Sequence, residues 1–167
     1  MLGCLMALGL AGCGQGAASV TVDPGRAAVG SAAPDFRATT LDGKSLSLHG
    51  LRGKPVLVNF WATWCAECQS EMPAIQATWA RHRAAGLQVV GVNFREGDVA
   101  RERRFLDQAG ASYPSLSDPD GKIADAYGVT IGLPVSIFID RAGIVSYIQT
   151  GPMSADFIEA RLAGILN

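Results

Sequence analysis

Cysteine is scarce in this chain. Its 167 residues include four cysteines, and two of them, Cys4 and Cys13, lie at the N-terminal end. A small secreted fold that depends on disulfides would need more cysteines, spread along the chain. The folded part must therefore be held together by an apolar core, and 49% hydrophobic residues suffice for one domain. Cys65 and Cys68 are therefore candidates for a chemically reactive site.

Clustered charge and histidine are scarce as well. The 14 basic and 15 acidic residues give a formal net charge of −1, and no basic run stands out. We therefore expect no nucleic-acid partner. The two histidines, His49 and His82, stand alone in the sequence. One cysteine pair and two isolated histidines do not provide the usual four-ligand zinc site, and we expect neither a metal nor a cofactor.

The N-terminal apolar segment is too short to span a bilayer as a helix. Residues 1–12 are small and apolar, which is typical of the apolar region of a secretory signal. Leu10-Ala11-Gly12-Cys13 resembles the bacterial lipobox, in which Cys13 would become the lipidated first residue of the mature protein. The usual positively charged segment is missing, because no Lys or Arg precedes Arg26. An ordinary cleaved signal or an uncleaved anchor is the alternative.

Residues 13–32 are rich in Gly, Ala and Ser, with few large apolar side chains. This composition predicts a flexible tether between the membrane and a folded domain over 33–167.

The pattern within 33–167 predicts an α/β domain with a mixed sheet. Asp42-Gly43, between two short alternating runs, predicts a hairpin. Helices between buried strands imply parallel pairing with helices on both faces, and a terminal hairpin adds an antiparallel pair. We predict core strands at 56–61, 87–94 and 135–139, a last strand at 144–148, and helices at 66–84, 98–109, 123–127 and from 154 onward. Residues 110–122 are predicted to form a loop.

Cys65 and Cys68 lie where a buried strand gives way to a helix. Residues three apart on a helix have β-carbons about 5–6 Å apart, so a small adjustment allows a disulfide. Backbone N–H groups and the helix dipole should hold the pKa of the Cys65 thiol below the usual value of about 8.5. Cys68, one turn inside the helix, should be more shielded. We therefore expect Cys65 to attack a substrate disulfide and Cys68 to resolve the mixed disulfide.

Two carboxylates near the dithiol bear on its redox poise. Glu67 lies between the cysteines and Glu71 follows one turn later. Both disfavour a further negative charge, so the thiolate should be less stabilised than in strongly oxidising proteins. The couple should then be more reducing, because stabilising the reduced thiolate is what makes such a protein an oxidant.

The stretch 56–68, which contains Trp64-Cys65-Ala66-Glu67-Cys68, closely resembles the active-site strand and turn of thioredoxin-like proteins, and most closely the membrane-anchored TlpA/ResA group. Pro73, five residues after Cys68, lies where the family's helix after the dithiol kinks. Gly132-Leu133-Pro134 resembles the cis-proline loop, and Ala33-Pro34-Asp35-Phe36 resembles the redoxin opening. The resemblance implies a thioredoxin-like α/β fold: a central mixed sheet flanked by helices, an N-terminal β-hairpin extension and an insert after the second core strand.

The resemblance also implies a substrate site. The loop at Pro134 should face the dithiol, with its backbone pairing with an extended substrate chain, and Trp64 and Leu133 should contact that substrate. An ordinary strand-start proline is the alternative at Pro134. Thioredoxin has a buried aspartate where this chain has Asn59, so another acid is needed to accept the proton of Cys68. Glu96 is the candidate, ahead of Glu67, and the alternative is a solvated loop residue.

Glu67 itself departs from the proline that many relatives have before the second cysteine. The implied function is an extracytoplasmic, monomeric thiol-disulfide oxidoreductase, lipid-anchored through Cys13. It would reduce disulfides in envelope proteins, such as apocytochrome c or copper-site cysteines, and would be recharged by a membrane thiol donor of the DsbD/CcdA kind. A Cu(I)-handling dithiol is one alternative. A thiol peroxidase is another, although its proline and hydroxyl positions are Val58 and Ala62 here.

Overall fold

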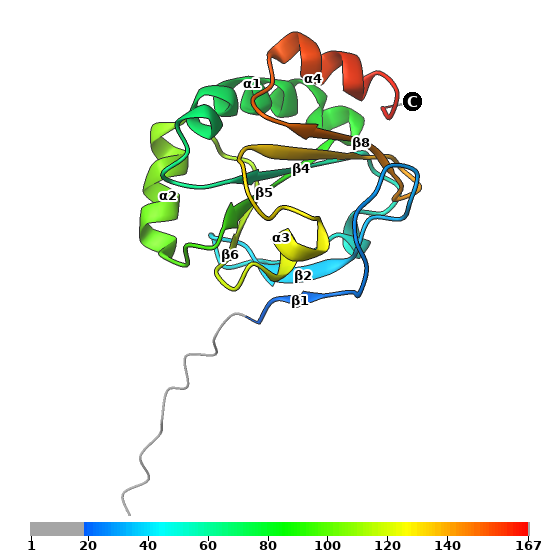
Figure 1. The fold of residues 1–167 in the computed structure, drawn as a ribbon. Coiled ribbons are helices and arrows are strands. Elements are labelled where there is room, and N and C mark those ends of the chain that lie inside the picture. Colours follow the sequence, from blue (N-terminus) through cyan, green and yellow to red (C-terminus); the bar gives the residue numbers. More distant parts are fainter. Residues whose placement is uncertain (1–18, 167) are drawn as a thin grey trace, which may run out of the picture.

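A computed structural model describes residues 19–166, which form two β-sheets and four α-helices (Figure 1). The strands are β1 (Thr21–Val22), β2 (Phe36–Thr39), β3 (Ser45–Ser47), β4 (Val56–Trp61), β5 (Gln88–Phe94), β6 (Ser115–Asp118), β7 (Val135–Ile139) and β8 (Val145–Thr150). The helices are α1 (Ala66–His82), α2 (Val99–Gln108), α3 (Lys122–Ala126) and α4 (Ala155–Leu162), with short 3-10 helices at His49–Leu51 and Arg83–Ala85.

The larger sheet has five strands in the order β6-β5-β4-β7-β8. The pairs β4–β5 and β5–β6 are parallel, whereas β4–β7 and β7–β8 are antiparallel. The mixed sheet and the terminal hairpin predicted from the sequence are thus confirmed. In the smaller sheet, β1, β2 and β3 run antiparallel, and β2 and β3 form the predicted hairpin.

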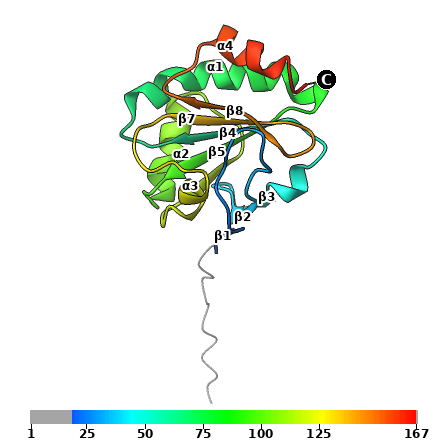
Figure 2. The same cartoon turned by 45° about the vertical axis from the view of Figure 1, so that its right-hand side comes forward.

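The central strand β4 separates two apolar cores. Its six residues are all buried, and alternate side chains face opposite sides of the sheet. Leu57 and Trp61 join a core formed with α1, α2 and α4. Val58 and Phe60 join a second core, which α3 and the small sheet cover. Figure 2 shows α1 and α4 along one side of the sheet and α3 with the small sheet on the other.

Part of the predicted tether belongs to the fold. Residues 21–22 form β1, which pairs with β2. The amide of Ala27 donates to the carbonyl of Ala126 at 2.9 Å, and Ala27 is buried. The composition of 13–32 indicated flexibility because it has few large side chains, but an edge strand needs backbone partners and only small apolar contacts. The folded region therefore begins before residue 33.

The strand β6 was also missed by the sequence analysis. Its four residues follow Pro114 and include two serines, so neither an apolar run nor alternation marks it. It pairs with β5, which decides its conformation through a long-range contact. With α2 it forms the insert after the second core strand β5, as the resemblance implied. Within residues 19–166, no helix is long and apolar enough to cross a membrane.

Candidate active site

The predicted dithiol forms a disulfide at the carboxyl end of β4. Cys65 and Cys68 are joined with a Cα–Cα distance of 5.3 Å. Cys65 is the N-cap residue of α1, and its Sγ accepts a hydrogen bond from the backbone N–H of Cys68 at 3.1 Å. Cys65 retains 6% exposure whereas Cys68 has none. The first sulfur therefore has the helix N-terminus and a path to solvent, and the second has neither.

The peptide bond between Leu133 and Pro134 is cis, as the resemblance implied. β7 begins at Val135, which pairs with Phe60 near the end of β4. The proline loop and the disulfide therefore lie at the same end of the sheet. Pro134 itself is buried, and Leu133 is partly buried against the core that contains both cysteines.

Apolar side chains remain exposed at this end of the sheet. Trp64, directly before Cys65, is 61% exposed, and Ile131, three residues before Pro134, is 88% exposed. The sequence analysis named Trp64 and Leu133 as substrate contacts but did not identify Ile131. An isolated isoleucine in a loop carries no signal in the sequence, and its exposure is visible only in the fold.

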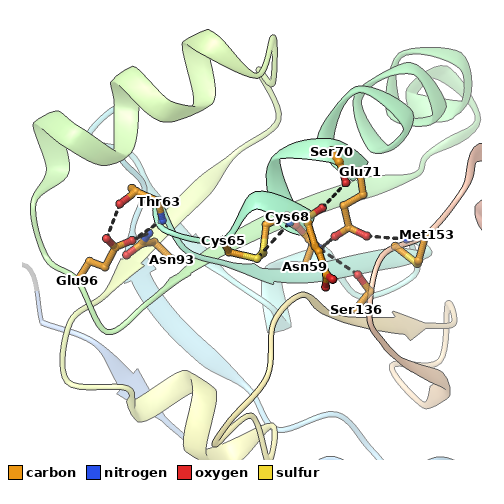
Figure 3. The surroundings of a disulfide bond; sticks show 11 residues. Asn59, Thr63, Cys65, Cys68, Ser70, Glu71, Asn93, Glu96, Ser136 and Met153 are labelled. Carbon is orange, nitrogen blue, oxygen red and sulfur yellow. Dashed lines mark hydrogen bonds between the residues drawn. A yellow bond between two sulfur atoms is a disulfide. The ribbon is translucent and has the colours of Figure 1, made fainter.

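A buried polar network lies on the Cys68 side of the disulfide. Asn59 Nδ2 donates to Glu71 Oε1 at 2.7 Å and to Ser136 Oγ at 2.9 Å. The amide of Met153 donates to Glu71 Oε2 at 2.9 Å. Figure 3 shows these side chains converging from β4, α1, β7 and the segment before α4. The Glu71 carboxylate thus links α1 to β4 and to the segment before α4, and Asn59 extends the network to β7.

The carboxyl group of Glu71 has a pKa close to neutral pH. Glu71 is 2% exposed, and burial raises its pKa from 4.5 to about 7, against the opposing effect of the Asn59 and Met153 hydrogen bonds. It follows Cys68 by three residues on α1, so the two side chains are neighbours on one helix face. The sequence analysis considered only the charge of Glu71. Its position at i+3 from a buried cysteine was the signal that could have identified it.

Glu96, the predicted proton acceptor for Cys68, is partly exposed and hydrogen-bonded on the Cys65 side. Its Oε2 accepts hydrogen bonds from the Thr63 N–H at 2.7 Å and from Asn93 Nδ2 at 2.7 Å, and its Oε1 accepts from Thr63 Oγ1 at 2.5 Å. Figure 3 shows this group on the opposite side of the disulfide from Glu71. These hydrogen bonds go to the backbone and side chain just before Cys65 rather than to Cys68. The geometry therefore favours Glu71 over Glu96 as the acid beside Cys68.

Glu67 and Cys13 were also predicted as site residues. Glu67 lies in the first turn of α1 with an exposed side chain, so solvent screens its charge from the dithiol. Cys13, the predicted lipidation site, lies outside the described residues. Among residues 19–166, no three His, Cys, Asp or Glu side chains are grouped so that they could hold a metal ion.

Known proteins share these features. A family model described as the AhpC/TSA family matches residues 29–148. The thiol-disulfide oxidoreductase ResA of Geobacillus kaustophilus is 38% identical over 138 residues, which are 83% of this chain and 78% of that protein.

Two solved structures extend the comparison. A thioredoxin family thiol:disulfide interchange protein from Chlorobium tepidum is 30% identical, with a TM-score of 0.75 over 84% of this chain and 99% of that one. A secreted Mycobacterium tuberculosis disulfide oxidoreductase is 31% identical, with a TM-score of 0.69 over 77% of this chain and 95% of that one. Both agree with the α/β architecture described above.

Proposed function

This chain belongs to the AhpC/TSA family and is a thioredoxin-like thiol-disulfide oxidoreductase, and we propose that it acts outside the cytoplasm as a reductase of disulfides in envelope proteins. The observation that carries the proposal is the contrast between its two cysteines. Cys65 Sγ accepts the Cys68 N–H at the helix N-terminus, whereas the Cys68 side chain is fully buried. A thiolate is therefore stabilised and accessible at Cys65, and a protected thiol is held at Cys68.

The reaction transfers two electrons from the dithiol to a substrate disulfide. The Cys65 thiolate attacks one substrate sulfur, the substrate S–S bond breaks, and the released thiolate takes a proton from water. The Cys68 thiol then loses its proton and attacks Cys65 Sγ. The mixed disulfide breaks, the second substrate thiol leaves, and the Cys65–Cys68 disulfide remains.

Glu71 is the proposed proton acceptor for Cys68, in place of Glu96. A general base works best when its pKa lies near the working pH. Glu71 has a pKa of about 7 and lies one turn beyond Cys68 on the same helix. Its hydrogen bonds from Asn59 and Met153 hold the carboxylate in place while the cysteine changes its protonation state.

The substrate is proposed to be an extended polypeptide segment that contains a disulfide. The exposed Trp64 and the partly buried Leu133 offer apolar contact, and the backbone next to Pro134 would pair with the substrate chain. Apocytochrome c and copper-site cysteines fit this description equally well.

The location and the electron source complete the proposal. One relative is a secreted disulfide oxidoreductase, which supports a site of action outside the cytoplasm. Lipidation of Cys13 would hold the domain at a bacterial membrane as a monomer. A reductant in that compartment must be recharged, so a membrane thiol donor of the DsbD/CcdA kind is the proposed partner.

Trapping tests the function directly. Cys68→Ser should hold substrates on Cys65 as mixed disulfides, because the resolving thiol is gone. Captured proteins, released by reduction and identified by mass spectrometry, should contain extracytoplasmic cysteine pairs. Cys65→Ser is the matched control and should trap few proteins, because Cys68 is buried. Equal trapping by both variants would contradict the assignment of Cys65 as the nucleophile.

A second measurement separates the reductase from a copper-handling module. The purified reduced protein should reduce a protein disulfide catalytically when a thiol donor regenerates it. Tight Cu(I) binding without catalytic disulfide reduction would favour the copper alternative.

A further inference from the structure

A fully buried carboxyl group lies close to the Cys65 side of the active site without a complete set of partners. Glu102, on α2, is 0% exposed. Its Oε1 accepts the Gly97 N–H at 2.9 Å and the Ser117 hydroxyl at 3.0 Å. Its Oε2 is buried and has no hydrogen-bond partner among the described residues. An unpaired buried oxygen of this kind carries a large desolvation penalty.

A second orphaned oxygen belongs to Asn93. The Asn93 side chain is 0% exposed, and its Oδ1 likewise has no partner within residues 19–166. Asn93 on β5 pairs in register with Ser117 on β6, so the two side chains lie on the same face of the sheet. Ser117 is the residue whose hydroxyl contacts Glu102. The two orphaned oxygens therefore occupy the same small region, and both are acceptors if Glu102 is ionised.

Counting the hydrogen-bond donors shows how two neighbouring acceptor oxygens could both be satisfied. An asparagine amide has one donor end and one acceptor end. The Nδ2 end of Asn93 donates to Glu96 Oε2, so its Oδ1 end is directed elsewhere. Asn93 and Glu102 have Ser117 as a common neighbour, through the strand register and through the Ser117 hydroxyl, and each has an oxygen that lacks a donor in the part of the chain that the structure describes. One hydrogen on Glu102 Oε2 would satisfy both orphaned atoms at once.

We propose that Glu102 is a neutral carboxylic acid whose proton is donated to Asn93 Oδ1, and that the resulting chain of hydrogen bonds positions the backbone before Cys65. The chain runs from Glu102 through Asn93 to Glu96, which accepts both the N–H and the hydroxyl of Thr63. Asn93 and Thr63 both donate to Glu96, so the chain meets at the Glu96 carboxylate. The three residues are positioning residues for the reaction of Cys65, so the inference rests on the proposed function.

The surroundings of Glu102 favour the neutral form. Burial raises its pKa, and the nearby carboxylates of Glu96 and Asp98 raise it further. On β6, Ser117 is neutral, and Asp118 directs its carboxylate to the amides at the start of α3, so it does not face Glu102. On α2, the neighbouring Arg101 and Arg103 have exposed side chains, whereas Glu102 points inward.

The backbone between Asn93 and Glu96 adopts an unusual conformation at Arg95. Arg95 has a φ of 57°, the left-handed region that residues other than glycine rarely adopt. Such conformations persist where the surroundings fix them, and they concentrate at functional sites. The side chain of Arg95 is tied to Asp125 at 2.6 Å. This turn directs Glu96 back toward Thr63, as Figure 3 shows for the labelled side chains.

Glu102→Gln and Glu102→Met test the proposal. Glutamine keeps an acceptor for Gly97 and Ser117 and offers an N–H to Asn93, so it imitates the neutral acid. Methionine has a similar size but no donor. Amide hydrogen exchange at Thr63 should be unchanged in Glu102→Gln and faster by roughly 3- to 10-fold in Glu102→Met, the effect of losing one hydrogen bond.

A second readout follows the wild-type protein itself. The carboxyl carbon of Glu102, observed by NMR, should have the chemical shift of a neutral acid at neutral pH. When alkaline pH removes that proton, the protection of the Thr63 amide relative to its intrinsic exchange rate should fall, and this fall should be absent in Glu102→Gln. The reaction of reduced Cys65 with a small aromatic disulfide should follow the ionisation of the Cys65 thiol and should show a second inflection, absent in Glu102→Gln, at the pH where Glu102 loses its proton.

An ionised Glu102 at neutral pH would overturn the proposal, as would equally fast Thr63 exchange in both variants. If Glu102→Met fails to fold, the titration of the wild-type protein and the glutamine variant still test whether Glu102 is a neutral hydrogen-bond donor. None of the exchange or NMR readouts requires a protein substrate. Loss of the reductase function with this exchange pattern intact would refute the proposed function alone, and the reverse result would refute only the hydrogen-bond chain.

Discussion

Two carboxylates flank the active-site disulfide, and their environments differ in kind. Glu71 is buried on the Cys68 side, accepts two hydrogen bonds, and has a pKa raised to about 7. Glu96, on the Cys65 side, is partly exposed and accepts three hydrogen bonds, two of them from Thr63. The first environment makes proton uptake easy, whereas the second uses a carboxylate to hold a segment of backbone.

The two environments suit two different tasks: accepting the proton of the buried thiol, and positioning the backbone before Cys65. A proton acceptor needs a pKa near the working pH and a place beside the buried thiol. A positioning group needs several firm hydrogen bonds and no change of charge. Glu71 satisfies the first description and Glu96 the second.

The largest expected effect concerns stability and Glu71. The folded protein keeps a proton on Glu71 up to about pH 7, whereas the unfolded chain loses it near 4.5. The free energy of unfolding should therefore fall as the pH rises through this window, by about 3 kcal/mol from this group. Glu71→Gln should remove that dependence. Urea unfolding of both proteins at about pH 5 and about pH 8 measures it.

Other buried acids also contribute to the pH dependence of the unfolding free energy, but they contribute equally in wild type and in Glu71→Gln. Glu102 and Asp118 also have raised pKa values through burial, and they contribute with the same sign. The difference between wild type and Glu71→Gln isolates one group. Equal pH dependence in the two proteins would show that Glu71 is not the acid that titrates in this window.

The second expected effect concerns the resolving step. Without a base beside it, Cys68 should lose its proton slowly, and decay of the mixed disulfide in Glu71→Gln should slow by roughly 100-fold. Rapid mixing of the reduced protein with a labelled disulfide peptide measures this step separately from the first attack. Glu96→Ala is the matched control, and its resolving rate should fall by no more than the roughly 3- to 10-fold expected from a looser segment before Cys65. The opposite ranking would restore Glu96 as the proton acceptor.

The sequence was informative wherever chemistry was local. Cys65 and Cys68 at the start of a helix, and Pro134 at the start of a strand, could be recognised because each signal lies within a few residues. For Glu71 the sequence analysis considered only the charge, because its hydrogen bonds from Asn59 and Met153 arise through the fold. A pKa raised by burial cannot be inferred before burial is known.

The fold shows the same division. The long apolar runs at β4, β5 and β7 were predicted, since each is buried on both faces and carries its own signal. β1 and β6 were not, because each is a short strand whose conformation is decided by the neighbour that it pairs with. For β6 that neighbour is β5, which also carries Asn93 close to the site. Asn93, which the sequence analysis did not name, lies on β5 at the position that pairs with Ser117 of β6.

A third, smaller effect concerns the first attack by Cys65. Glu96→Ala removes the acceptor for both groups of Thr63, so the segment before Cys65 should become looser and the attack should slow by roughly 3- to 10-fold. Thr63→Val removes only the hydroxyl contact and should have a weaker effect. The rate of reduced Cys65 with a small disulfide measures both. An equal effect in the two variants would mean that the backbone N–H contact contributes little.

The smallest expected effect concerns Glu67. Its side chain is exposed at the first turn of α1, and an exposed charge pair is worth at most about 1 kcal/mol. Glu67→Gln should therefore make the couple slightly more oxidising, by no more than about 20 mV, because one negative charge near the thiolate is gone. Equilibration with a glutathione buffer measures the potential.

The comparison that matters is with Glu71→Gln, measured in the same buffer. A buried charge is screened less than an exposed one, so removing it should shift the potential further in the same direction. A larger shift for Glu67 would mean that the residue at the exposed helix end sets the redox poise, despite its solvation. A wild-type potential typical of a strong oxidant would contradict the reductase itself, because both carboxylates oppose the thiolate that an oxidant must stabilise.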